Sequence, residues 1–140
     1  MVIEIPGKPV GKKYEVSRGK LRRSDKTIAF ESFVGTLAKL KSPPEPWTGA
    51  VAVQIIFHLV PIPSWPMWRR RAALEGRLWC KAVPDGDNVC KSICDAMTGI
   101  VYVDDRQNTD YLIRKRWGPE EKTVVTVTLL EYSPTQTRFL

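Results

Sequence analysis

The sequence predicts an α+β fold: a single domain, residues 1–140, in which helices pack on a mixed, mostly antiparallel sheet. The first observation is the length, because 140 residues suit one domain with its own core. The second is that segments with strand-like alternation and segments with helical spacing both occur. The third is their order along the chain, which lacks the regular strand–helix alternation of a parallel α/β sheet.

The first half of the chain is expected to form two strands and a helix, with a basic loop between them. Residues 2–5 and 50–60 alternate apolar and polar side chains, as half-buried strands do. Residues 6–26 show no sustained period and are expected as a loose basic loop or hairpin. The buried face expected for the second strand is Val51, Val53, Ile55, Phe57 and Leu59. The helix is expected over 27–40, from the spacing of Ile28, Phe33, Leu37 and Leu40.

The second half is expected to contain two helices, three strands and a tail. After Pro61-Ile62-Pro63 a short helix is expected, with Ser64 as its cap and Gly76 at its end. The second helix is expected over about 87–98, the strands over 100–105, 111–117 and 122–132, and a loose tail over 133–140.

The charge is distributed unevenly. The formal net charge is +7, from 22 Lys/Arg against 15 Asp/Glu, yet residues 84–110 carry six aspartates against two basic residues. Carboxylates repel a polyanion unless a cation lies between them, so this pattern indicates a metal site within a phosphate-binding surface. A basic surface that only keeps the protein in solution is the simpler alternative.

Other features of the composition predict the compartment. The N-terminal residues lack the pattern of a secretory signal, and the longest apolar run, residues 50–60, is too short to span a membrane. Three cysteines are an odd number without a disulfide pattern, which favours a reducing cytoplasm. Because no apolar run is long enough to span a membrane, we expect no membrane partner. Because the chain has no Gly-rich phosphate loop, we expect no nucleotide cofactor.

The helix expected over 87–98 has two different faces. Its core stripe is Val89, Ile93, Ala96 and Met97. Its polar stripe is Asp87, Lys91 and Asp95, with Asp85 just before the helix. The simplest interpretation is a solvated ion-pair ladder on this stripe and a helix cap at Asp85.

Chain geometry favours a metal site instead. A helix of 11 or 12 residues spans about 17 Å, and a strand of five or six residues from Ile100 covers the same distance back. Asp104 and Asp105 are therefore expected to return to the level of Asp85 and Asp87. Alternation along the strand turns Asp105 inward as a ligand and leaves Asp104 as an outer or alternative ligand. Carboxylates gathered in this way need a cation, and they suit Mg²⁺ or Mn²⁺.

Other metal sites fit the sequence less well. A calcium loop that starts at Asp85 would need glycine and glutamate where Cys90 and Ala96 stand. A zinc site from Cys80, Cys90 and Cys94 lacks a close cysteine pair, and the chain has one histidine. That histidine, His58, lies opposite the apolar face of its strand, which argues against a catalytic base.

The acidic segment contains a spaced series: Asp85-x-Asp87-Asn88, Lys91, Asp95-Ala96, Gly99 and Asp104-Asp105-x-Gln107. This series resembles the signature of the RusA-type Holliday junction resolvases, a family of crossover junction endodeoxyribonucleases. The resemblance is specific over residues 84–107 and looser over the rest of the chain. It implies a small homodimeric, Mg²⁺-dependent endonuclease of α+β fold, common in phages and prophages, that nicks four-way DNA junctions symmetrically in DNA recombination and repair.

The resemblance also implies residue roles. Asp85, Asp87 and Asp105 match the metal-binding catalytic aspartates, and Lys91 matches the catalytic lysine. Many members carry a lysine directly before the Pro-Asp pair, whereas this chain has Val83 there, with Lys81 nearby. The residues expected to contact DNA phosphates are Lys12, Lys13, Arg22, Arg23, Arg69, Arg70, Arg71, Lys81, Arg114 and Arg116.

Two alternatives remain at this point. A non-catalytic DNA-binding module would use the aspartates in a structural ion-pair network. A nucleotide-sugar enzyme would use Asp85-x-Asp87 to hold a metal–diphosphate, although the chain lacks a nucleotide-binding unit. Self-association is expected in the nuclease, because paired nicks need two sites. Trp47, Trp65 and Trp68 could serve that interface, the core or base stacking.

Overall fold

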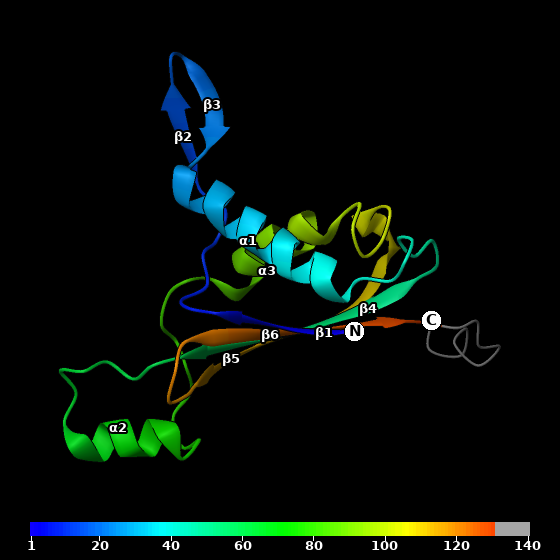
Figure 1. Ribbon diagram of the computed structural model, residues 1–140. Helices are drawn as coiled ribbons and strands as arrows, with labels where there is room; N and C mark the ends of the chain where they lie inside the picture. Colours follow the sequence, from blue (N-terminus) through cyan, green and yellow to red (C-terminus); the bar gives the residue numbers. More distant parts are fainter. Residues whose placement is uncertain (131–140) are drawn as a thin grey trace.

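The fold contains a four-stranded sheet and a separate two-stranded hairpin, which projects away from the rest of the domain (Figure 1). The structure is a computed structural model that describes residues 1–130, so the predicted tail over 133–140 lies outside the described residues. The sheet contains β1 (Val2–Pro6), β4 (Val51–Leu59), β5 (Asn108–Trp117) and β6 (Lys122–Leu129), and the hairpin contains β2 (Tyr14–Ser17) and β3 (Lys20–Arg23). The helices are α1 (Asp25–Lys41), α2 (Met67–Leu74) and α3 (Gly86–Met97), followed by the short 3-10 helix η1 (Asp105–Gln107).

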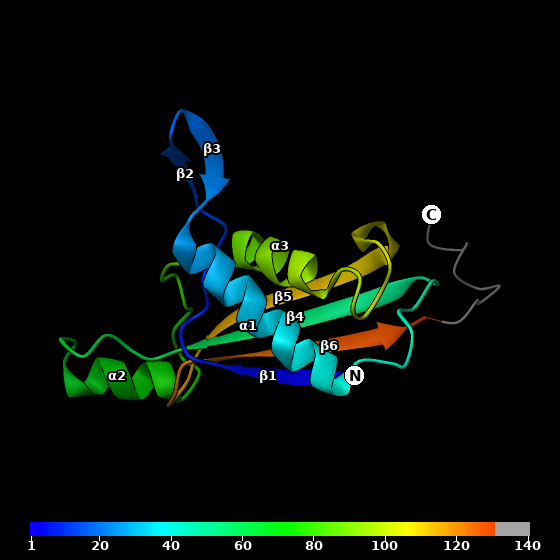
Figure 2. The same ribbon diagram turned by 45° about the horizontal axis from the view of Figure 1, so that its top comes forward.

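The strand order in the sheet is β1-β6-β4-β5. The pairs β1–β6 and β4–β6 are antiparallel and the pair β4–β5 is parallel, so the predicted mixed, mostly antiparallel sheet is confirmed. A parallel pair needs a long crossover, and the segment with α2 and α3 provides it. α1 and α3 cover the same face of the sheet (Figure 2). The α+β fold class is therefore confirmed.

The core lies between this sheet face and the two helices. β4 buries alternate side chains, which are the five predicted from its sequence: Val51, Val53, Ile55, Phe57 and Leu59. On α3, Val89, Ile93 and Met97 are buried in the same core and Ala96 is packed against it. The predicted faces of both elements are therefore confirmed, because each carries a regular apolar period.

The helix predicted over 27–40 is confirmed as α1, but it buries a different face. Ile28 and Phe33 are exposed, and Leu40 is 77 % exposed. The buried face carries Thr27, Phe30, Glu31, Val34, Gly35 and Ala38. Small residues let α1 approach the end of α3: a Cβ added at position 35 would lie 3.6 Å from the carbonyl oxygen of Ala96. Close helix packing therefore outweighed the spacing of the larger apolar side chains. No helix within residues 1–130 is long and apolar enough to cross a membrane.

The short helix after Pro61-Ile62-Pro63 is confirmed as α2, with a different start from the one predicted. Its N-cap is Pro66, which makes no side-chain cap bond, so the predicted cap at Ser64 is wrong. The helix ends before Gly76, as predicted. Figures 1 and 2 show α2 set apart from the two-layer body, near the ends of the strands.

The strand predicted over 100–105 is wrong. Residues 98–104 form a turn with isolated bridges, in which Tyr102 pairs with Trp47 and with Thr98. Val101 and Tyr102 are both fully buried although they are consecutive, which a one-sided strand does not allow. The Tyr102 hydroxyl donates to the Cys94 carbonyl at 2.7 Å and so fixes the turn against α3. The returning strand is β5, which starts only at Asn108.

Candidate active site and nucleic-acid interface

The start of α3 presses closely onto the sheet. A Cβ at Gly86 would lie 3.1 Å from a methyl group of Ile113 and 3.7 Å from the Phe57 ring, so even a methyl group there would be tight against the sheet. Asp85 is the N-cap of α3, yet its side chain makes no cap bond, and Asp87 lies in the first turn. Both carboxylates are exposed at the positive end of the helix dipole.

The ion-pair ladder on α3 is not formed. Lys91 is exposed, and within residues 1–130 neither Lys91 nor Asp87 takes part in an ion pair. Asp95, the third residue of the predicted ladder, pairs with Lys12 instead. The carboxylates of Asp85 and Asp87 are thus left open to a ligand, with the Lys91 ammonium one turn further along the helix.

The second pair of aspartates lies at the opposite end of α3. Asp104 caps η1: its carboxylate accepts from the Arg106 amide at 2.8 Å, and the Gln107 side chain accepts from the Asp104 amide at 2.8 Å. The hydrogen bond from the Arg106 amide and the charge of the Arg106 guanidinium hold the pKa of Asp104 below its usual value. Asp105 is exposed and has no ion pair within the described residues.

The predicted return of Asp105 to Asp85 and Asp87 is therefore wrong within one chain. Gly86, at the start of α3, lies beside Ile113 and Lys115 of β5. Asp105 precedes the start of β5 at Asn108, and that start is about six residues, or about 20 Å, away along the strand. Within residues 1–130, no three His, Cys, Asp or Glu side chains are grouped so that they could hold a metal ion. The metal-binding roles of Asp85, Asp87, Asp104 and Asp105 stay predictions.

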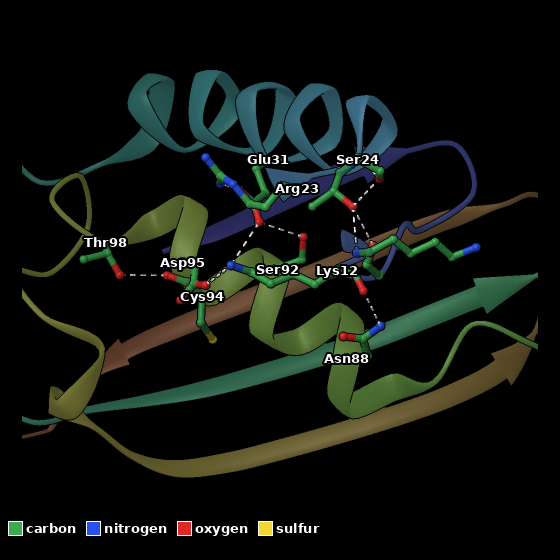
Figure 3. A network of polar contacts seen from close by, with 12 residues as sticks. Lys12, Arg23, Ser24, Glu31, Asn88, Ser92, Cys94, Asp95 and Thr98 are labelled. Carbon is green, nitrogen blue, oxygen red and sulfur yellow. Dashed lines mark hydrogen bonds and ion pairs between the residues drawn. The ribbon is translucent and has the colours of Figure 1, made fainter. Parts of the chain in front are cut away.

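A buried charge network, which the sequence analysis missed, joins the N-terminal segment to both helices (Figure 3). The Lys12 ammonium pairs with Asp95 of α3, and it lies 3.4 Å from Glu31 of α1. The side chains of Lys12 and Glu31 are only 9 % and 8 % exposed. Glu31 also pairs with Arg23 and accepts from the Ser92 hydroxyl at 3.3 Å. Burial lowers the pKa of Lys12, but Asp95 and Glu31 outweigh that effect and hold it above its ordinary value.

This network changes the expected role of Lys12. We expected it to contact DNA, but its ammonium is directed into the protein between two carboxylates. Asn88 of the acidic motif donates to the Lys12 carbonyl at 3.1 Å, and a Cβ at Gly11 would lie 2.5 Å from the Asn88 amide. Asn88 and Asp95 therefore hold the N-terminal segment against α3. The sequence signal for this network was Glu31, an acidic residue on the small-residue face of α1.

The basic hairpin of β2 and β3 follows this anchored segment and projects past the start of α1 (Figure 1). All eight residues of its strands are exposed. Lys13 is exposed just before it, Arg22 pairs with Glu15 and Asp25, and Arg23 pairs with Glu31. The DNA contacts expected from Lys13, Arg22 and Arg23 stay predictions.

The remaining predicted DNA contacts lie beside α2 and on β5. Arg69, Arg70 and Arg71 are on α2, and Lys81 is exposed between α2 and α3. The register of β5 with β4 places Arg114 and Arg116 on the face away from α3. Lys115 faces the other way, where its ammonium donates to the carbonyl of Ala82. At most two of these three cations can therefore share a surface, as the alternation predicts.

The cysteines take structural positions. Cys90 and Cys94 are buried on α3 with their Sγ atoms 3.9 Å apart, and Cys80 lies half-buried in the segment before α3. His58 packs closely against Gly118: a Cβ added at this glycine would lie 3.2 Å from the histidine side chain. Burial and the neighbouring Lys122 lower the pKa of His58 below its ordinary value, which keeps the imidazole neutral at pH 7.

The fold and the site define a class of protein by its structure: an α+β domain with two open carboxylates at a helix N-terminus, on a chain of net charge +7. Comparison with known families specifies the class. The family model "Endodeoxyribonuclease RusA" matches residues 6–128, and the chain belongs to this family. The family comprises endodeoxyribonucleases that resolve Holliday junctions, so the resemblance drawn from residues 84–107 is confirmed. The chain is also 28 % identical over 126 residues to "Uncharacterized protein YqaN" of Bacillus subtilis (strain 168), covering 86 % of each chain.

Proposed function

We propose that this protein is a metal-dependent endodeoxyribonuclease that resolves Holliday junctions by two symmetric phosphodiester hydrolyses, as a homodimer with Mg²⁺ or Mn²⁺. The observation that carries the proposal is the pair Asp85 and Asp87. Their carboxylates are exposed at the positive end of α3 and are used neither in a helix cap nor in an ion pair within residues 1–130. The three free cysteines support action in a reducing cytoplasm.

Within residues 1–130, one chain does not bring three carboxylates together as a metal site would need. One chain offers Asp85 and Asp87 at one end of α3 and Asp105 beyond the other end. A second copy related by two-fold symmetry would complete the site if it placed the Asp105 end of one chain beside the Asp85 end of its partner. A divalent cation held by such a set would neutralise charge on the scissile phosphate and make a bound water more acidic.

The chain's own residues contribute positive charge and orientation. Lys91 lies one turn from Asp87 with its ammonium in solvent, and it can stabilise negative charge that develops on the phosphate oxygens. The basic hairpin and the arginines of α2 would hold the junction arms through phosphate contacts, which position DNA without reading its sequence. These contacts should make junction binding strongly dependent on salt.

The direct test compares a labelled four-way junction with a linear duplex of the same sequence, each with Mg²⁺ and with EDTA. We expect two nicks at symmetric positions in the junction with Mg²⁺, none with EDTA, and little cleavage of the duplex. Binding of the junction without nicking under any divalent metal would favour the alternative, a non-catalytic DNA-binding module with a structural ion-pair network.

Dimerisation gives a second test. Two symmetric nicks need two acidic sites, and one chain supplies the carboxylates for only one of them. Sedimentation or light scattering at micromolar concentration should give about twice the chain mass of 15.9 kDa. A protein that stays monomeric, even with a junction and Ca²⁺ in place of Mg²⁺, would contradict paired cleavage and the shared metal site.

A further inference from the structure

A groove lined by tryptophan and cationic side chains lies beside the start of α3, in the segment that joins β4 to α3. Its aromatic walls are Trp65, Trp79 and Trp117, and Arg69 and Lys81 supply positive charge. Its volume of about 470 Å³ falls in the range of small-ligand sites, which is roughly 300–1,000 Å³. The groove is therefore large enough for a flat group the size of a nucleobase.

Two of the tryptophans form a fixed wall. The rings of Trp65 and Trp117 meet edge to face, with centroids 5.2 Å apart and an interplanar angle of 71°. The Arg69 guanidinium lies 3.9 Å from the centroid of the Trp65 ring, and the Trp117 indole nitrogen donates to the Trp79 carbonyl at 3.3 Å. These contacts hold the wall in one geometry without a ligand.

The third tryptophan is open to solvent. Trp79 is 81 % exposed, and the Arg116 guanidinium lies 5.7 Å from its ring centroid. Trp79 also lines a second hollow, together with Arg77, Lys115 and Arg116. An indole that is exposed and lines two hollows with cationic side chains has no packing role in the core, so its face is free to stack on a ligand.

The charge of the groove specifies the ligand. Among residues 1–130, no acidic side chain lines either hollow, and the nearby Glu75 is neutralised by Arg77 at 2.8 Å. A flat aromatic group that carries negative charge fits this surface, and a nucleotide has both properties. The groove is also close to the candidate active site along the chain, because Ala82, which lines it, lies three residues before Asp85.

We propose that this groove binds an unstacked base of the DNA strand next to the scissile phosphate, with the base stacked on Trp79. The flanking phosphates would contact Arg69, Lys81 and Arg116. Bases within a duplex are already stacked on their neighbours, whereas bases opened at a branch point or in a single strand can offer a face to an indole. The groove would thus favour branched or single-stranded DNA. The position of the base next to a scissile phosphate rests on the proposed nuclease function, whereas the test below measures only DNA binding.

The test measures binding by fluorescence anisotropy, in Ca²⁺ without Mg²⁺, to a labelled 15-nucleotide oligothymidylate and to a blunt 15-base-pair duplex. Trp79→Ala should bind the single strand about 5- to 150-fold more weakly and leave duplex affinity within about twofold. Trp79→Phe should restore most of the affinity. The slope of log K against log salt should stay unchanged in Trp79→Ala, because no charge is removed, and it should fall by about 0.7 in Arg116→Ala.

The matched control is Trp68→Ala. Trp68 is 68 % exposed on α2 and lines neither hollow, so this variant should bind both DNAs as the parent does. The proposal would be overturned if Trp79→Ala and Trp68→Ala lost single-strand affinity equally. It would also be overturned if Trp79→Ala lost affinity equally for the single strand and the duplex. Conversion of the dimer to a monomer by Trp79→Ala would also overturn it, because the groove would then be a protein interface.

The outcome is separable from the nuclease proposal. If the parent protein fails to nick junctions but Trp79→Ala loses single-strand affinity selectively, the base-binding groove stands and the nuclease function falls. If the parent nicks junctions and Trp79→Ala binds single strands normally, only the groove falls. Circular dichroism of each variant should match the parent, since Trp79 is exposed and outside the core.

Discussion

Asp87→Asn is expected to abolish junction nicking, by at least about 100-fold, because the amide removes one charged ligand from the acidic pair at the start of α3. Junction binding should be retained or become tighter, since a negative charge that faces the phosphates is lost. A gel-shift assay in Ca²⁺ and a nicking assay in Mg²⁺ on the same junction measure the two effects separately. The loss of a favourable helix-dipole interaction should cost stability only about 0.3–1 kcal/mol.

The matched control for this change is Asp110→Asn. Asp110 is an exposed aspartate of β5 that belongs to neither aspartate pair, and the substitution changes the net charge by the same amount. It should leave nicking within about twofold of the parent. Equal loss of nicking in both variants would show a general charge effect, and equal loss of binding and nicking in a folded Asp87→Asn would contradict the assigned role.

Glu31→Ala is expected to lower the free energy of unfolding by about 3 kcal/mol, because it removes one partner of a buried charge network. The Lys12 ammonium would lose one of its two carboxylates, and the hydroxyl of Ser92 would lose its acceptor. Against a typical total of about 5–15 kcal/mol, this loss is large. Urea denaturation at pH 7 measures it. At that pH the raised pKa of Lys12 leaves the pair intact, and its contribution is lost only as the pH rises through that raised pKa.

The same variant should loosen the N-terminal segment, since Glu31 also pairs with Arg23 at the end of the hairpin. In Glu31→Ala, amide hydrogen exchange over residues 11–24 should become faster than in the parent, and by a larger factor than exchange over β4. Glu45→Ala is the matched control, because Glu45 is exposed and has no ion pair within residues 1–130. It should change stability by less than about 0.5 kcal/mol, and a comparable small effect of Glu31→Ala would contradict the structural role of the network.

Much of the fold followed from local periodicity. The alternation in β4 and the apolar stripe of α3 identified both elements and their buried faces, because each period reports directly which side meets the core. The spacing of the acidic motif over 84–107 identified the family, since a series of polar residues at fixed intervals is more specific than composition. Local pattern was less informative for α1, where Gly35 and Ala38 mark the packed face.

The candidate site also has a part that local sequence predicted and a part that it did not. The open carboxylates of Asp85 and Asp87 were predictable, because their position before an amphipathic helix is a local property. The place of Asp105 was not, because it depends on where the returning strand starts. A buried Tyr102 bonded to α3 holds residues 98–104 as a turn, so the aspartate pair is left at the far end of the helix.

The sequence by itself determined the α+β class, the RusA family and the acidic motif at the start of α3. Only the tertiary structure decided that Asp95 pairs with Lys12 rather than with Lys91, that α1 buries Glu31, and that three tryptophans distant in sequence form one groove. The reason is physical. Period and motif are properties of neighbouring residues, whereas these contacts join residues that are between 14 and 83 positions apart. Their free energy depends on burial that no single segment can create.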